Sequence, residues 1–145
     1  MTYTVSKVEM WTGELEDRVG GLSARLGPLA EAGVDLEVVV ARRQPQLPGK
    51  GIVWLGPVKG TKAQQAAASA GLTRAADLFA LRVEGPNKPG DCHKVTRLLA
   101  DAGISLRGLA ATVCGSRYVL SLGFDTEADA AKAATLLKNV GATKK

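Results

Sequence analysis

The chain has 145 residues, of which 46% are hydrophobic and 23% are charged, and its formal net charge is +5 at pH 7. This composition excludes a disordered chain and leaves room for one core or for two small ones. The sequence has no long apolar stretch and no basic segment leading into an apolar run, so we expect neither a membrane span nor a secretory signal. The 2 cysteines lack CxxC spacing and are expected to be reduced thiols, which favours a cytoplasmic protein.

The first half of the sequence predicts a strand, a helix, two strands and a second helix. These elements are expected at residues 5–11, 20–32, 34–42, 51–56 and 61–70. Gly27 and Pro28 fall inside the first helix, where a proline lacks the N–H that a helix needs and crowds the preceding turn. We therefore expect a kink or a late start in that helix.

The second half predicts the same order of elements. Its strands are expected at residues 78–83, 104–113 and 116–124. The apolar face of its first helix is formed by Val95, Leu98, Leu99 and Ala102. Gly103 is expected to end this helix in the left-handed conformation. The second helix is expected at residues 127–138, with Thr126 as its N-cap.

The two halves are copies of one unit. Residues 17–43 align with residues 87–113 at a constant offset of 70 and without a gap. The phrases LAEAGVDL and LADAGISL are nearly identical, and TKAQQAAA resembles TEADAAKA later in the chain. Two matching blocks in the same order indicate duplication of a whole unit. We therefore divide the sequence into a first unit at residues 1–72 and a second unit at residues 73–145.

Each copy has a strand, then a glycine turn, then a helix that ends in an AG motif. The turns read DRVGGL and NKPGDC. This pattern resembles the ACT domain, a ligand-binding module of amino-acid-metabolising enzymes and their regulators. The usual ACT turn is close to D/N-R-P-G-L, and the usual helix end is L-A-x-A-G-I-N-I. Both copies match, except that Val19 replaces the proline of the first turn and that Asp35 and Ser105 replace the asparagine.

The resemblance implies an α+β chain of two ferredoxin-like βαββα(β) units, each with an antiparallel sheet and with helices on one face. It also implies that units pair, commonly side by side, and that an amino acid is held at their junction. By position, the ligand contacts that it implies are Asp17, Gly20, Gly21 and Asp35 in the first copy and Asn87, Gly90, Asp91 and Ser105 in the second.

Elementary chemistry agrees with such a site. Gly20 and Gly90 lack a Cβ, so a ligand can approach the backbone closely. Free N–H groups in the first turn of the following helix favour a carboxylate. An oxygen of Asp35 or Ser105 could accept a hydrogen bond from an ammonium group. The same residues are also explained without a ligand, if the glycines only make tight turns and Asp35 is a solvated strand residue.

The sequence offers little for catalysis or for a metal. Cys92 and His93 are adjacent on a helix and diverge by about 100°, so they do not form a nucleophile–base pair. Cys92 aligns with Leu22, so we expect a buried thiol beside a surface histidine. One histidine and 2 cysteines at wide spacing do not make a zinc site. We therefore expect no enzyme activity, no metal and no cofactor.

Little sequence remains after the second helix of either unit for a fourth strand. We therefore expect three-stranded sheets with an open edge at the first strand of each unit. Because open edges are usually paired or covered, this favours a homodimer. The leading hypothesis is a regulatory or sensor protein that binds a small ligand, such as an amino acid, at the interface between its units and regulates a separate partner protein.

Two other functions compete with this hypothesis. The first is a protein-interaction or oligomerisation module that has lost its ligand. The second is an RNA-binding protein, because RNA-recognition modules share this element order and stack bases on sheet aromatics. The aromatic residues on the relevant strands are Trp11, Trp54, Phe79 and Tyr118. The string SRYVLSLGF fits the RNA-recognition motif poorly and the positive charges are scattered, so we expect no nucleic-acid partner.

Overall fold

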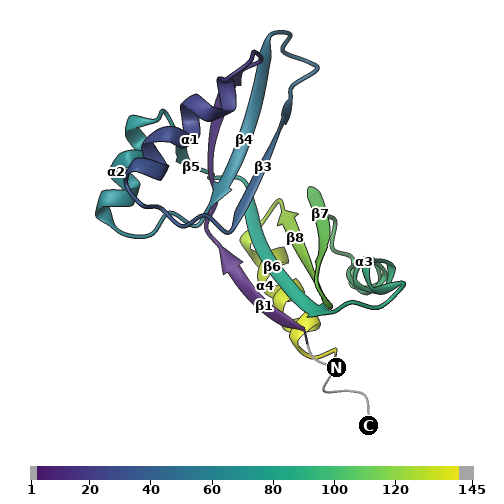
Figure 1. Ribbon diagram of the computed structural model, residues 1–145. Helices are drawn as coiled ribbons and strands as arrows, with labels where there is room; N and C mark the ends of the chain where they lie inside the picture. Colours follow the sequence, from purple (N-terminus) through teal and green to yellow (C-terminus); the bar gives the residue numbers. More distant parts are fainter. Residues whose placement is uncertain (1–2, 141–145) are drawn as a thin grey trace. The chain divides into compact units, whose positions relative to one another are not determined.

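The chain folds into two compact units, seen in the computed structural model, which describes residues 3–140 (Figure 1). One is the continuous segment Glu9–Ala76, which we call the inserted unit. The other joins the first strand, β1 (Thr4–Val8), to the chain from Asp77 onward, and we call it the split unit. This division differs from the one expected from the repeat, residues 1–72 and 73–145, chiefly in where the first strand belongs.

The inserted unit is a four-stranded antiparallel sheet covered by two helices. Its elements are β2 (Trp11–Glu16), α1 (Gly21–Glu31), β3 (Val38–Arg43), β4 (Lys50–Gly56), α2 (Thr61–Ser69) and β5 (Thr73–Arg74). The strand order is β3-β4-β2-β5. Alternate strand residues such as Trp11, Val53 and Leu55 are buried with Leu29 of α1 and Ala67 of α2. Both helices therefore cover the same face of the sheet.

The split unit repeats this design. Its elements after β1 are β6 (Phe79–Pro86), α3 (Asp91–Asp101), β7 (Gly108–Cys114), β8 (Arg117–Phe124) and α4 (Glu127–Lys138). The strand order is β1-β6-β8-β7, again antiparallel throughout. Val83, Leu120 and Phe124 are fully buried with Val95 of α3 and Leu137 of α4. The predicted α+β architecture, with helices on one face of each sheet, is confirmed.

Each sheet has four strands, so the prediction of three-stranded sheets with an open edge is wrong. In the inserted unit, β5 pairs with β2. In the split unit, β1 pairs with β6, from Thr4 opposite Glu84 to Val8 opposite Ala80. The strand predicted at residues 5–11 is therefore two strands, β1 and β2, which lie in different sheets. Sequence alternation describes which residues face a core, but it does not say which core.

The AG motif is the end of a helix in both copies. Gly103 has a φ of 74°, the left-handed conformation that was predicted for it. The N–H of Ile104 donates to the carbonyl of Leu99 at 2.9 Å, and the equivalent bond joins Val34 to Leu29 at 3.0 Å. These bonds define the Schellman motif, in which the residue after the glycine also packs back on the helix. The repeated phrases LAEAGVDL and LADAGISL thus specify a helix end with its apolar contact.

Helix α1 begins at Gly21 and continues through Pro28, so the late start that we considered is not found. Pro28 has no N–H to donate to the carbonyl of Ala24. Its own carbonyl accepts the N–H of Ala32 at 3.2 Å, and Leu29 beside it is only 1% exposed. Burial of the last turn in the core holds the helix together across the missing bond.

Thr126 is the N-cap of α4, as predicted, and its hydroxyl accepts the N–H of Asp129 at 3.1 Å. Thr126→Ala is expected to lower the free energy of unfolding of the split unit by about 1 kcal/mol, because this amide loses its acceptor. Urea denaturation followed by circular dichroism measures the change. Thr135→Ala is the control, since Thr135 lies inside the same helix, where alanine is the better helix former. Equal losses in both variants would contradict the capping role.

Candidate ligand-binding loops

A loop with the same backbone conformation precedes the first helix of each unit. The first glycine loop, residues 17–20, leads into α1, and the second glycine loop, residues 87–90, leads into α3. Gly20 has φ 85° and ψ −2°, and Gly90 has φ 87° and ψ −3°. These left-handed angles favour glycine at both positions. A Cβ built on either glycine would have no atom within 4 Å, so both face open space.

The helix starts beside these glycines leave backbone donors without a side-chain cap. Gly20 and Gly90 are the N-cap residues of α1 and α3, and within the described part of the chain neither helix start has a side-chain cap hydrogen bond. The carbonyl oxygens of these glycines accept the N–H groups of Ala24 and Lys94, both at 3.0 Å, which fixes the first helical turn. The amides of the second and third helical residues precede the first of these helical hydrogen bonds, so they have no acceptor within the helix. Such an arrangement attracts an anion, because the amides and the helix dipole act together.

The predicted site residues of each glycine loop are close together in sequence. Asp35 and Ser105 are distant from these loops in sequence, and they do not belong to a strand. Asp35 and Ser105 are exposed and stand three residues before β3 and β7 begin, respectively. The strands expected at 34–42 and 104–113 therefore start later than predicted. Between residues 3 and 140, no hydrogen bond or ion pair is found that ties either side chain to a glycine loop. Their role as ligand contacts stays a prediction.

The two glycine loops differ in their surroundings. In the first, Arg43 Nε lies 3.0 Å from Asp17 Oδ2, so the Asp17 charge already has a partner. Gly21 is buried, and a Cβ there would overlap the backbone oxygen of Glu16. In the second, Asp91 takes the place of Gly21, and its Oδ2 accepts the N–H of Lys88 at 3.2 Å. The need for a glycine at position 21 is therefore explained by the close packing against the backbone of Glu16, without any ligand.

A buried polar group lies near the second loop and has no counterpart near the first. Tyr118 is only 5% exposed, and its hydroxyl has no hydrogen-bond partner among the described residues. The ring of Tyr3 meets it edge-on at 6.1 Å. Burial raises the pKa of Tyr118 far above its ordinary value, and Tyr3 and then Asp91 raise it further. Tyr118 stands opposite Gly85, two residues before the second glycine loop begins.

The cross-strand pair that holds Tyr118 explains this difference between the copies. Tyr118 stands opposite Gly85, and a Cβ on Gly85 would clash with the ring of Tyr3. Gly85 aligns with Leu15 at the offset of 70, and Leu15 stands opposite Gly51 in the inserted unit. The large residue has moved to the other strand and has lost its hydroxyl. Sequence analysis did not select Tyr118 as a ligand-binding residue. A glycine on one strand that can face an aromatic residue on the neighbouring strand was the signal that could have found it.

Tyr118→Phe is expected to raise the free energy of unfolding of the split unit by about 1 kcal/mol, because it removes a buried hydroxyl without a partner. The raised pKa also has a consequence in alkali. Below a pH of about 10, which is the pKa of tyrosine in the unfolded chain, the contribution of Tyr118 to the free energy of unfolding does not change with pH. At higher pH the unfolded chain loses the phenol proton that the native state keeps, so the stability of the natural chain falls. Denaturation at neutral and alkaline pH tests both effects. A less stable variant at neutral pH would show that the hydroxyl has a native partner.

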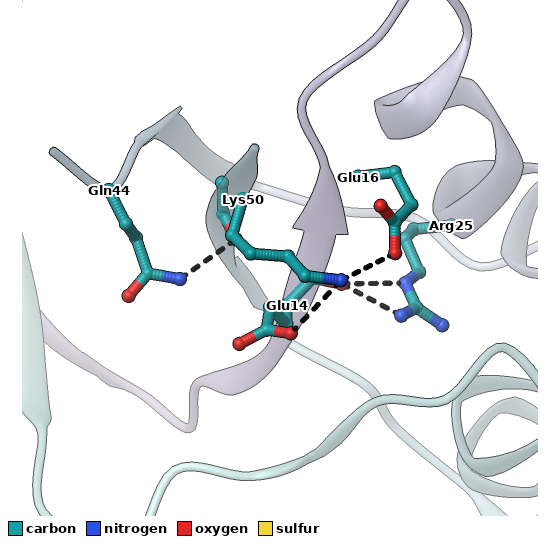
Figure 2. Close-up of polar contacts among 6 residues, drawn as sticks. Glu14, Glu16, Arg25, Gln44 and Lys50 are labelled. Carbon is teal, nitrogen blue, oxygen red and sulfur yellow. Dashed lines mark hydrogen bonds and ion pairs between the residues drawn. The ribbon is translucent and has the colours of Figure 1, made fainter. Parts of the chain in front are cut away.

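A second polar cluster, on β2 and β4 of the inserted unit, has its charges paired (Figure 2). Lys50 Nζ lies 2.7 Å from Glu16 Oε1 and 3.8 Å from Glu14 Oε1. The hydrogen bond from Lys50 lowers the pKa of Glu16 and raises that of Lys50 itself. Arg25 of α1 donates to the carbonyl oxygens of Glu14 and Ala70. The cluster joins strands and helices, and it shows no carboxylate arranged for acid–base chemistry.

Two sequence expectations about reactive residues have different outcomes. Cys92 is exposed, so the prediction of a buried thiol is wrong, whereas His93 is on the surface as expected. Cys92 lies in the first turn of α3, and the buried residues of this helix are Val95 and Leu99. No cluster of three or more potential metal ligands occurs in residues 3–140. None of the described helices is long and apolar enough to cross a membrane.

The sheet aromatics do not form an RNA-stacking surface. Trp11, Phe79 and Tyr118 lie on the helix-covered faces of their sheets and belong to the cores or pack against them. Trp54 lies on the opposite face of its sheet, where the guanidinium of Arg42 stands 5.6 Å from the ring centroid. RNA-recognition modules need aromatic rings on the open face of two neighbouring strands. A single ring already covered by an arginine does not supply that surface.

No protein-family model matches the sequence, and no curated protein matches it. Solved structures do resemble it. A protein from Bacteroides thetaiotaomicron is 17% identical, with a TM-score of 0.75 over 93% of this chain and 89% of that one. The regulatory subunit of aspartate kinase from Thermus flavus is 18% identical, with a TM-score of 0.62 over 99% of this chain and 98% of that one.

The corresponding regulatory subunit from Thermus thermophilus, in a ligand-free form, is 14% identical with a TM-score of 0.63, and the likeness covers 94% of this chain and 95% of that chain. At such identities the likeness concerns the fold. It spans nearly the whole of both chains, and both aspartate kinase subunits consist of ACT domains. The repeated glycine loops, the repeated Schellman ends and these full-length likenesses together establish that the chain has a tandem ACT fold.

Proposed function

We propose that this protein is a regulatory sensor that binds an α-amino acid at the second glycine loop and acts on a separate partner protein. One observation carries the proposal: Gly90 is left-handed, faces open space and begins a helix that has no side-chain cap. The amides beyond it are donors ready for a carboxylate. The named regulatory subunits with this fold support a regulatory role rather than a catalytic one.

The surroundings of the second loop favour an amino acid over a simple carboxylic acid. Asp91 at the start of α3 would repel a lone carboxylate but would attract the ammonium group of an amino acid. Its Oδ2 already accepts one hydrogen bond, from Lys88, and a carboxylate has sites for several. Tyr118, which stands opposite Gly85 just before this loop, would supply a further donor through its unpartnered hydroxyl. The first glycine loop lacks both features, so we assign it the weaker binding.

A thermal-shift screen of the intact chain against each common amino acid tests the proposal. A ligand present at 100 times its dissociation constant should add about 2.7 kcal/mol to the stability of the unit that binds it. Asp91→Asn should weaken binding of the active amino acid by about tenfold or more, because a charged hydrogen bond is lost. Asp101→Asn is the matched control, since it makes the same change at the other end of α3. Stabilisation by none of them would overturn the proposal.

One other function has a specific observation in its favour. The conformations of Gly20 and Gly90 and the packing of Gly21 are explained by the backbone alone, as they would be in a module that keeps the fold without a ligand. Such a protein would act through contacts with other chains. The screen separates the two functions, because the interaction module predicts no change in stability with any amino acid.

A further inference from the structure

The ring of Tyr3 lies over Gly85, close to the end of β6. A Cβ built on Gly85 would stand 2.8 and 2.9 Å from two carbons of that ring, and 3.5 Å from a carbon of the Tyr118 ring. Two aromatic rings therefore occupy the space that a side chain at residue 85 would need. A glycine within a strand often marks such a close approach by other groups. We call the space above Gly85 that the ring of Tyr3 fills the ring site.

The ring site is next to the second glycine loop. Thr4 pairs with Glu84, so Tyr3 continues β1 alongside Gly85. Tyr118 stands opposite Gly85 on the other neighbouring strand and is buried in the core that α3 helps to form. The rings therefore meet on the side of the sheet that α3 covers. The second glycine loop begins two residues after Gly85 and leads into that helix.

The inserted unit has no equivalent of the ring site. Leu15 aligns with Gly85 at the offset of 70, is buried and contributes its own side chain to the core. In the split unit this contribution is missing, and a side chain from another strand takes its place. The position is thus filled by a ring that is not fixed to β6 and that can leave without disturbing the pairing of that strand.

Tyr3 covers a polar group that has no other use in the fold. Tyr118 is only 5% exposed, and its hydroxyl has no hydrogen-bond partner among the described residues. Tyr3 is half-buried and packs edge-on against the Tyr118 ring, with the ring centroids 6.1 Å apart. A ligand that replaced the Tyr3 ring would therefore reach Tyr118. A second ring is the natural replacement, because the space already holds one and offers an aromatic edge-to-face contact.

We propose that the amino acid bound at the second glycine loop is an aromatic one, and that its ring displaces the ring of Tyr3 from the ring site. Tyr3 is then a built-in competitor that fills this space while the loop is empty. The inference rests on the proposed amino-acid binding and names the class of side chain that is selected. An amino acid without a ring would bind through its carboxylate and ammonium groups alone and would leave Tyr3 in place.

Calorimetric titration of the intact chain with L-phenylalanine and with L-alanine tests the inference. In the natural chain L-phenylalanine should bind more tightly than L-alanine. Tyr3→Ala should bind L-phenylalanine about tenfold more tightly again, because a site that is occupied part of the time loses apparent affinity in proportion. The affinity for L-alanine should not change. Tyr3→Phe is the matched control, since it keeps the competing ring and should bind both amino acids as the natural chain does.

Gly85→Ala is a second variant, which closes the ring site instead of opening it. The added Cβ meets atoms of the Tyr3 and Tyr118 side chains rather than backbone, so the Tyr3 ring can move aside and the strand is kept. A thermal melt verifies that the variant folds. Binding of L-phenylalanine should weaken by at least about tenfold, because its ring no longer fits, whereas binding of L-alanine should stay the same.

The outcomes separate this inference from the proposed function. Tighter binding of a non-aromatic amino acid than of L-phenylalanine, with no effect of Tyr3→Ala, would overturn the inference and leave the amino-acid sensor standing. Weaker binding of L-phenylalanine by Tyr3→Ala would also overturn it, because Tyr3 would then be part of the site and not a competitor. Binding of no amino acid by any of these variants would overturn both proposals.

Discussion

Gly21→Ala is expected to lower the free energy of unfolding of the inserted unit by about 2 to 3 kcal/mol, which is the cost of overpacking a tight site. A Cβ at Gly21 would overlap the backbone oxygen of Glu16 and would also crowd its carbonyl carbon. Neither atom belongs to a flexible side chain, so β2 and α1 must separate to make room. Urea denaturation of the intact chain, followed by circular dichroism, measures the loss.

Gly27→Ala provides the matched control for this prediction. Gly27 lies in the same helix, and a Cβ built on it meets no atom within 4 Å. Alanine is the better helix former by about 0.5 to 1 kcal/mol, whereas the following Pro28 disfavours a Cβ on a helical residue before it. The two effects oppose each other, so this variant should change the free energy of unfolding far less than Gly21→Ala does. If Gly21→Ala behaved like Gly27→Ala, the close approach of α1 to β2 would not exist in solution.

Removal of residues 1–8 is expected to destabilise the split unit by about 3 kcal/mol or more, although these residues precede the inserted unit in sequence. The truncation removes Val5, which packs against the core of the split unit and stands opposite the fully buried Val83. Burying one valine contributes about 1.5 to 3 kcal/mol, and the edge of β6 also loses its five paired residues.

Hydrogen exchange of the truncated chain locates this effect. Amides of β6 should lose protection, while amides of β2, which directly follow the deleted segment, should keep theirs. The inserted unit thus serves as an internal control within the same molecule. Loss of protection in β2 with β6 unchanged would show that the first strand belongs to the inserted unit, as the sequence division at residue 72 implies.

Sequence reasoning succeeded where the signal is local. The AG motif specifies a Schellman helix end, and the hydroxyl at Thr126 specifies an N-cap, because each depends on residues within one turn. The repeated glycine turn located both loops for the same reason. The resemblance to ACT domains then supplied the arrangement of elements, which the solved structures bear out.

The failures concern contacts between distant residues. Val8 and Trp11 are both buried, and their spacing reads as one strand, yet they lie on strands of two different sheets. Pairing of β1 with β6 joins residues about half the chain apart, which no local pattern reports. The polar environment of the second loop was missed in the same way, because Tyr118 is adjacent to Tyr3 and Asp91 only in space.

The two copies have diverged in a way that bears on function. The inserted unit fills the position near its loop with Leu15 opposite Gly51, and the split unit fills it with Tyr118 opposite Gly85. An apolar side chain completes a core, whereas a buried hydroxyl without a partner costs stability unless something binds it. We therefore also expect Tyr118→Phe to weaken amino-acid binding while it raises stability, and both effects are measurable on this single variant.

Amide NMR spectra of the intact chain, recorded during titration with the amino acid that stabilises it best, test the central claim most directly. The account predicts saturable shifts centred on the amides of Gly90, Asp91, Cys92 and His93, with smaller shifts or none at the first glycine loop. Saturable shifts elsewhere in the chain that leave these four amides unchanged would contradict it, and so would the absence of any shift with every amino acid tested.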